Sequence, residues 1–198
     1  MAQVLKAEVK ARILEAAGAA LATQGYSKTS MAKIARDAKV ATANVYRYFA
    51  DKAALFDAVV PASVVAEHDA LLDERLDSLG GPSEQEGAAA GHLLDFWIQH
   101  RWAVIILLDH ASETPYSDYP QRFVRRLITQ GERTLGRPLS HTQSRVVEII
   151  FDNTRRALAE ILRSSDDPTQ LRALVSGFWS YQLPGLDGLS AWMKLSAE

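Results

Sequence analysis

Side chains that could contact DNA are concentrated between Ser30 and Lys52. Asn44 can form two hydrogen bonds with an adenine edge, and Arg47 can do the same with guanine or can hold a phosphate. Hydroxyl and ammonium groups can bind phosphates, and small methyl groups suit the thymine methyl. The candidate DNA contacts are Ser30, Lys33, Lys39, Thr42, Ala43, Asn44, Tyr46, Arg47, Tyr48 and Lys52. Together they have the chemistry of a surface that reads a DNA sequence.

Two short helices joined by a turn would have to position these side chains. Apolar residues at helical spacing predict one helix that begins near Thr29 or Ser30, whose hydroxyl can cap it. They predict a second helix from about Thr42 to Phe49. Val45 and Phe49 face inward in the second helix, which leaves the polar side chains on its outer face. An α-helix fits the major groove of B-DNA. The stretch therefore predicts a helix-turn-helix.

The charge of the chain is divided unevenly along its length. Residues 1–52 hold nine Lys or Arg and four acidic side chains, a net charge of +5, whereas residues 53–198 have a net charge of −7. A basic segment attracts phosphates, and an acidic body is repelled by them. The overall net charge of −2 is therefore compatible with DNA binding. Chance clustering of charges on a solvated surface is the alternative explanation.

Several classes of chemistry lack the residues that they need. The chain has no cysteine, which excludes disulfides, thiolate nucleophiles and cysteine-bound zinc. Its five histidines are not paired at metal-binding helical spacing, and neither a Gly-x-Ser-x-Gly elbow nor a glycine-rich phosphate loop occurs. The longest apolar run, from Trp102 to Leu108, is far shorter than the ~20 residues that span a bilayer, and the N-terminus lacks a signal-peptide core. We therefore expect a cytoplasmic protein that is no enzyme, uses no cofactor or metal and enters no membrane.

Helical spacing of apolar residues continues through the whole chain, without a convincing strand. The predicted fold class is therefore all-α. We expect a three-helix N-terminal helix-turn-helix domain over residues 1–52 and a larger helical domain for ligand binding and dimerisation over residues 53–198.

Local signals predict where several helices begin or end. Gly25 is expected to stop the first helix, Asp51 to cap the fourth and Pro61 to interrupt it. Ser83 to Glu86 has the pattern of a capping box. The pair Pro184-Gly185 is expected to end a long helix and to leave a short last one.

Many positions between residues 9 and 60 follow one fixed order and spacing. The segments concerned are Arg12 to Ala17, Gly25-Tyr26, Thr29 to Met31, Ile34-Ala35, Val40, Tyr46 to Phe49, Lys52 and Ala54 to Phe56. In this order they resemble the tetracycline-repressor (TetR) family of bacterial transcription regulators. The resemblance implies a homodimer with one N-terminal DNA-binding domain per subunit. It also implies C-terminal domains that dimerise, hold a ligand pocket and release a pseudo-palindromic DNA operator when the ligand binds.

Two positions depart from the pattern of that family. Lys39 occupies the turn position that is normally glycine, and a lysine with positive φ there costs about 1 kcal/mol relative to glycine. Ala41 replaces the usual serine or threonine before the recognition helix. Thr42 could serve as the cap instead, which would shift the helix start by one residue.

Polar and aromatic residues of the middle helices are the candidates for a ligand site. Asp109-His110 ends the most apolar helix and Asn153 lies on a long apolar one, and a buried polar group without a partner costs about 1–3 kcal/mol. A protein partner or plain core packing is the alternative for each residue. The candidate ligand contacts are Trp97, His100, Asp109, His110, Phe123 and Asn153. Such a mixture indicates an apolar or aromatic ligand with a few polar anchors.

Two long helices, at about 140–163 and 168–183, form the predicted dimer face. They carry more apolar surface than one subunit easily buries, and they could pair with their symmetry mates as a four-helix bundle. The apolar residues concerned are Ile149, Ile150, Leu158, Ile161, Leu171, Leu174, Val175, Phe178 and Trp179. Packing within one subunit is the alternative.

These features and the resemblance predict a homodimeric DNA-binding repressor that a small apolar or aromatic effector releases from a pseudo-palindromic, double-stranded operator. An activator, or a DNA-binding regulator controlled by a protein partner, fits the same residues. A helical enzyme or binding module with incidental N-terminal helices is a third interpretation. A salt-dependent, sequence-selective DNA complex would separate the first two from the third.

Overall fold

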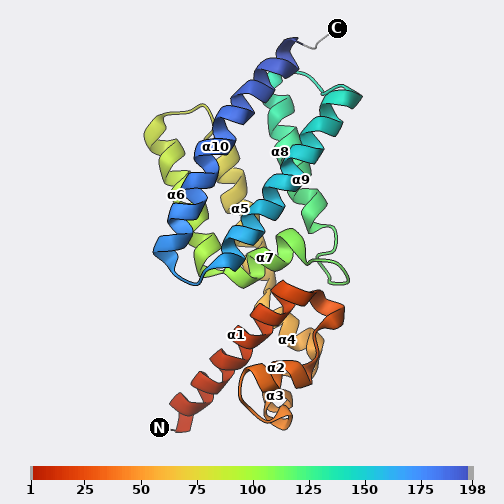
Figure 1. The fold of residues 1–198 in the computed structure, drawn as a ribbon, viewed down its shortest axis with the longest axis vertical. Helices are drawn as coiled ribbons and strands as arrows, with labels where there is room; N and C mark the ends of the chain where they lie inside the picture. Colours follow the sequence, from red (N-terminus) through yellow and green to blue (C-terminus); the bar gives the residue numbers. More distant parts are fainter. Residues whose placement is uncertain (1, 196–198) are drawn as a thin grey trace.

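The computed structural model describes residues 2–195, with side chains for residues 6–195, and every regular element in this part is an α-helix. The molecule is elongated, with a small group of N-terminal helices at one end and a larger helical body above it (Figure 1). The predicted all-α fold class is confirmed. No helix in the described part is long and apolar enough to cross a membrane.

The N-terminal group consists of α1 (Ala2–Lys28), α2 (Met31–Asp37), α3 (Thr42–Tyr48) and α4 (Lys52–Val59). Their apolar faces meet in a small core that includes Ile13, Ile34, Val45 and Leu55, each at most 1% exposed. The helical conformation of α1 is broken at Gly25, whose φ of 78° lies in the left-handed region that favours glycine. The predicted stop is therefore confirmed, although helical turns resume up to Lys28.

α4 connects the two parts of the molecule. Asp51 caps it by accepting a 2.7 Å hydrogen bond from the amide of Ala54, as predicted. Leu55 packs in the N-terminal core and Phe56 in the core of the body. The helix ends at Val59, and Pro61 separates it from the next helix, also as predicted. The domain boundary between residues 52 and 53 stays a prediction.

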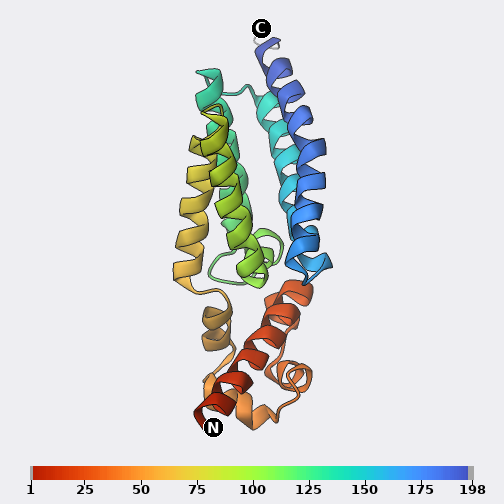
Figure 2. The same cartoon turned by 90° about the vertical axis from the view of Figure 1, so that its left-hand side faces the viewer.

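The body consists of α5 (Ala62–Asp77), α6 (Ser83–Gln99), α7 (Arg101–Asp109), α8 (Tyr119–Leu135), α9 (His141–Ser164) and α10 (Pro168–Leu195). Seen from the side, α5, α6 and α8 form one layer and α9 and α10 form the other (Figure 2). α7 lies at the end of the body nearest the N-terminal group and contacts α1, α6, α8 and α9. Ala103 to Leu108 are at most 3% exposed, which confirms that this apolar run is buried on all sides.

The predicted helix end at Pro184-Gly185 is wrong, because α10 continues through both residues to Leu195. Both lie on the exposed surface, where water can satisfy the carbonyl that loses its partner at a proline. The end of α10 is also held from outside. The carbonyl of Met193 accepts hydrogen bonds from Arg137 at 2.8 Å and from Gln143 at 2.9 Å.

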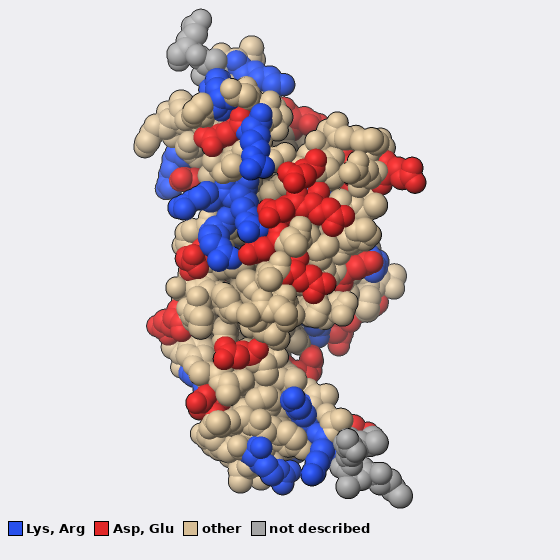
Figure 3. All heavy atoms as spheres, turned by 180° about the vertical axis from the view of Figure 1, so that it is seen from behind, with Lys and Arg blue, Asp and Glu red and all other residues tan. Residues whose placement is uncertain are grey.

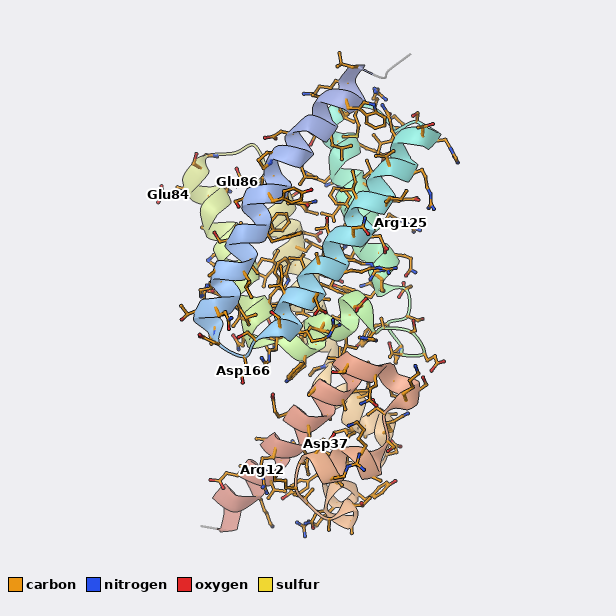
Figure 4. The ribbon with its side chains drawn as sticks, viewed as in Figure 1. Arg12, Asp37, Glu84, Glu86, Arg125 and Asp166 are labelled. Atoms are coloured by element: carbon orange, nitrogen blue, oxygen red, sulfur yellow. The ribbon has the colours of Figure 1, made fainter. Side chains whose placement is uncertain are left out.

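The capping box predicted at Ser83 to Glu86 is wrong as well. α6 begins at Ser83, directly after Pro82, and no side chain caps its free amides. Glu86, labelled near the start of α6 in Figure 4, instead accepts a 3.2 Å hydrogen bond from Arg75 of α5. The Glu86 carboxylate, which the local pattern predicted to cap α6, is thus paired with a residue of another helix.

α1 and α7 form the main contact between the N-terminal group and the body. Gly18 of α1 lies so close to the Trp102 side chain that a Cβ atom on Gly18 would stand 2.6 Å from the indole. Arg101 stacks 4.2 Å from the Trp102 ring centre and donates hydrogen bonds to Glu15 at 3.4 Å and to the Ser165 carbonyl at 2.7 Å. The spacing of these two helices is therefore tightly set.

Candidate DNA-binding surface and ligand cavity

The outer face of α3 carries the side chains predicted to read bases. Val45 is fully buried and Phe49 is 5% exposed, so both hold α3 against the N-terminal core, as predicted. The other side chains are exposed or half-buried: Thr42, Ala43, Asn44, Tyr46, Arg47 and Tyr48. The Arg47 guanidinium lies 5.5 Å from the Tyr48 ring centre, a stacking arrangement that orients it. The structure thus brings six predicted contacts together on one helix.

The turn before α3 fixes the register of the recognition helix. Lys39 has a φ of 56°, the left-handed conformation considered for this position. Its amide donates a 3.1 Å hydrogen bond to the Arg36 carbonyl, which helps hold the strained turn. Ala41 precedes the helix without a side-chain cap, and Thr42 is the first helical residue. The alternative in which Thr42 caps the helix is therefore wrong.

α2 supplies a second row of candidate phosphate contacts. Ser30 accepts a 3.2 Å hydrogen bond from the Lys33 amide, which confirms it as the cap of this helix. The Lys33 ammonium bonds Asp37 at 2.7 Å and thereby lowers the pKa of that carboxyl group. Arg36, 75% exposed and only 3.7 Å from Asp37, is a further candidate that our sequence analysis missed. The signal was available, because Arg36 lies one turn beyond Lys33 on the same helix.

Lys52 lies at the start of α4, but its ammonium group points back to the end of α1. Nζ donates hydrogen bonds to the carbonyls of Tyr26 at 2.8 Å and Thr29 at 3.1 Å, and it stands 4.1 Å from the Tyr26 ring centre. An ammonium group has three donors, so one stays available for a phosphate. Lys52 therefore holds the α1–α2 connection, a role that its position in the sequence does not indicate.

Charged side chains differ in arrangement between the two ends of the molecule. Lys and Arg gather near the tip of the N-terminal group, whereas basic and acidic side chains adjoin one another on the body (Figure 3). On the body they pair α8 with α5: Arg122 and Arg126 lie 3.0 and 3.4 Å from Asp69, and Arg126 lies 3.1 Å from Asp73. The body thus neutralises much of its basic charge internally.

A cavity of about 490 Å³ lies between the two layers of body helices. Its size falls in the range of small-molecule sites. Two predicted ligand contacts, Trp97 and Phe123, line it. Other members of its largely apolar wall are Leu72, Leu76, Leu94, Leu127, Ile128, Phe151, Leu158, Trp179, Leu186, Leu189 and Met193. Most of them lie on helices that are remote in sequence, which is why our sequence analysis did not find them.

Charged and amide groups in the cavity wall already have protein partners. Arg75 donates hydrogen bonds to Ser78 at 3.3 Å and to Glu86 at 3.2 Å. Gln130 donates to the Leu76 carbonyl at 2.9 Å. Arg75 is the one charged residue among the cavity's described lining, so the wall offers no unpaired charge.

A buried hydrogen-bond chain extends from the cavity wall to the surface of the body. Trp97 donates from Nε1 to Nε2 of His68 at 2.8 Å, Nδ1 of His68 lies 2.5 Å from the Tyr119 hydroxyl, and that hydroxyl donates to Asp69 at 2.8 Å. His68 is fully buried, and burial lowers its pKa to about 4. Burial likewise raises the pKa of Tyr119. His68 is therefore neutral, with its Nδ1 proton directed to Tyr119.

Four of the predicted ligand contacts do not line this cavity. Asp109 lies 3.0 Å from Arg163 in an ion pair that joins α7 to α9. His110 lies 3.7 Å from Asp109, and partial burial lowers its pKa. The His100 ring packs within the body, and Asn153 borders a separate, more polar hollow between α8 and α9. A ligand role for these four residues stays a prediction.

The predicted dimer face separates into buried and exposed residues. Leu158, Leu171 and Val175 are at most 2% exposed, so packing within the subunit accounts for them. Ile149 and Leu174 remain 48% and 39% exposed. On α10 the exposed apolar face also includes Tyr181, Trp192 and Leu195. An apolar surface on both long helices is thus left open to solvent.

Comparisons with known proteins agree with this arrangement of the N-terminal group. Residues 13–59 match the family model for bacterial regulatory proteins of the tetR family. No curated protein matches the chain. Two similar solved structures are both of NalD, the secondary repressor of the MexAB-OprM multidrug efflux pump in Pseudomonas aeruginosa. One is 22% identical, covers 87% of this chain and 95% of its own chain, and has a TM-score of 0.36. The other, of native NalD, is 20% identical, covers 88% of this chain and 96% of its own chain, and has a TM-score of 0.35. Over residues 13–59, this chain is therefore similar to bacterial regulatory proteins of the tetR family.

Proposed function

We propose that this chain is a cytoplasmic, homodimeric transcriptional repressor that leaves a pseudo-palindromic operator when an apolar effector enters the body cavity. The exposed face of α3 carries the proposal. It presents Asn44 and Arg47, the two side chains suited to base edges, on a helix whose other face is anchored by Val45. This is the geometry of a recognition helix that enters the major groove.

The predicted DNA contacts divide into two kinds by their position. Asn44 and Arg47 are assigned to adenine and guanine edges, and the methyl groups of Thr42 and Ala43 to thymine. The phosphate contacts are assigned to Ser30, Lys33, Lys39, Lys52 and the two tyrosine hydroxyls of α3. We place the end of the DNA-binding domain at residue 52.

Dimerisation is assigned to the exposed apolar face of α9 and α10. A two-fold axis through this face would set Ile149 and Leu174 against their symmetry mates and would place two α3 helices on one side of the dimer. Paired helices of this kind read two half-sites, which explains the pseudo-palindromic operator. The effector is assigned to the cavity lined by Trp97 and Phe123, because its apolar wall and volume suit a small molecule.

Selection of bound DNA from a random library, followed by gel-shift assays at several salt concentrations, tests this function. We expect a palindromic consensus and a complex that weakens steeply as salt rises. Absence of any sequence-selective complex would overturn the proposal. Sedimentation as a monomer at micromolar concentration would overturn the dimer, and activation of a reporter by the DNA-bound protein would identify an activator instead.

A further inference from the structure

Two glycines occupy cavity-facing positions in the middle of body helices. Gly91 on α6 and Gly131 on α8 both line the cavity, and a Cβ atom added to either would meet no atom within 4 Å. Glycine is among the poorest residues for a helix interior, so neither position is explained by local helix stability. Neither has a positive φ or a close neighbour that would require glycine. What the two positions share is the open space in front of them.

The cavity is elongated along the helices. Its lining on α10 extends from Val175 to Met193, a separation that corresponds to about 27 Å at the α-helical rise. Trp97 and Leu158 line it as well, and both lie deep in the core of the body. Its lining residues come from α5, α6 and α8 in one layer and from α9 and α10 in the other (Figure 2). Such a shape suits a long, narrow molecule.

The described part of the wall offers hydrogen-bonding groups but no free charge to a ligand. The charge of Arg75 is paired with Glu86 at 3.2 Å, and an additional ion buried among apolar side chains would be strongly disfavoured. Ser176 and Ser190 on α10 line the cavity and carry hydroxyl groups. A hydroxyl or carbonyl group could bond either of them.

The cavity reaches the surface at apolar residues. Leu79, at the end of α5, and Leu183, on α10, both line it and are 41% and 44% exposed. An apolar rim favours entry of an apolar molecule and offers nothing to hold a charged one.

We infer that the cavity binds an elongated, uncharged molecule with a hydrocarbon body, and that Gly91 and Gly131 are the specificity-determining positions that keep the space for it. The inference rests on the proposed function only in naming this cavity as the effector site. The inference adds the elongated shape and the absence of charge of the effector, which the apolar wall alone does not determine. A side chain at either glycine would occupy the volume that the ligand needs.

Binding of the neutral dye 1-N-phenylnaphthylamine to the full-length protein, followed by displacement with straight-chain alcohols, tests the inference. Gly91→Leu and Gly131→Leu should weaken dye binding by about tenfold or more, since filled space excludes the ligand. Gly87→Leu is the matched control, because Gly87 lies one turn earlier on α6, does not line the cavity and has equally open surroundings. The dye affinity of Gly87→Leu should stay within about twofold of the parent's, because this leucine would lie outside the cavity and would not occupy its volume.

Long-chain alcohols should displace the dye, whereas carboxylates and alkylammonium ions of equal length should not. Thermal melting separates a blocked cavity from a damaged fold, because replacing a helical glycine should keep or raise the melting temperature of all three variants. Unchanged dye binding in folded Gly91→Leu and Gly131→Leu would overturn the inference, and so would carboxylates that compete as well as alcohols.

A gel-shift assay in the presence of alcohol distinguishes this inference from the proposed function. If alcohol binds the cavity but does not release operator DNA, the result supports the inferred class of ligand and contradicts the proposed release of DNA by that ligand. Alcohol that releases DNA from the parent and from Gly87→Leu supports both. Failure of every neutral chain to bind overturns the inference even if the protein binds its operator.

Discussion

Acidification should weaken the body through one buried side chain, His68. Its ring is fully buried, and Nε2 accepts the hydrogen bond from Trp97 while Nδ1 is directed to Tyr119. A second proton would have to enter at Nε2, where it would displace the Trp97 bond and place a charge in the core. Asp69 favours that charge and Arg126 opposes it, but burial is the largest influence and lowers the pKa of His68 from 6.5 to about 4.

The size and sign of the effect follow from the two pKa values. Between about pH 6.5 and 4 the unfolded chain binds a proton at His68 that the folded chain does not bind, so the free energy of unfolding falls as the pH falls. Each pKa unit corresponds to about 1.4 kcal/mol, so the loss should approach about 3 kcal/mol near pH 4. The contribution is fully present above pH 6.5.

Urea unfolding at several pH values between 7 and 4 measures this loss. His68→Phe should be less stable at pH 7, because it leaves Trp97 Nε1 without an acceptor and removes one of the two hydrogen bonds of the Tyr119 hydroxyl. It should nevertheless lose about 3 kcal/mol less on acidification than the parent. Parallel pH profiles for the parent and His68→Phe would refute the assignment of the acid sensitivity to this ring.

Two further substitutions test the DNA-binding domain. Arg47→Ala should weaken specific binding by about 1–3 kcal/mol and relax one base preference in gel-shift assays with single-base operator variants; unchanged affinity and preference would contradict its base contact. Lys52→Ala should weaken binding to all sequences alike and flatten the salt dependence. It should also lower the free energy of unfolding by about 1–2 kcal/mol, because the Tyr26 and Thr29 carbonyls lose a charged donor, and an unchanged urea midpoint would contradict that second role.

Signals that depend on neighbouring residues were predictable from the sequence. Ser30 and Asp51 cap their helices because an N-cap needs only amides two or three residues away. The same holds for the break at Gly25. The prediction at Ser83 to Glu86 failed because Glu86 has a stronger, distant partner in Arg75, which a local pattern does not contain.

The same distinction between local and long-range signals applies to the candidate sites. The six candidate contacts on α3 belong to one short helix, so the sequence sufficed to group them. The cavity depends on how α5, α6, α8, α9 and α10 are spaced, and its most informative residues, Gly91 and Gly131, have no chemistry of their own. The partner of Asp109, Arg163, is remote in sequence, so this ion pair could not be predicted from local patterns.

The α1–α7 contact is the place where a change in the body should affect the DNA-binding domain. A Cβ atom at Gly18 would stand 2.6 Å from the indole of Trp102 and 2.8 Å from its Cβ atom, which rotation of the ring cannot move away. Gly18→Ala must therefore separate the two helices, and overpacking of this kind costs about 1–3 kcal/mol. Better helix propensity returns at most about 1 kcal/mol.

Thermal melting and operator affinity together test this contact. Gly18→Ala should melt below the parent and bind DNA more weakly, because a tilt of α1 would move α3 relative to the body. Gly87→Ala, without a neighbour within 4 Å, should melt at or above the parent. Trp102→Leu in the Gly18→Ala background should recover part of the loss, since the indole Nε1 has no hydrogen-bond partner among the described residues and only its volume is in conflict. If Gly18→Ala behaves like Gly87→Ala, the two helices are not held by close packing, and the α1–α7 contact would not couple the proposed effector site to α3.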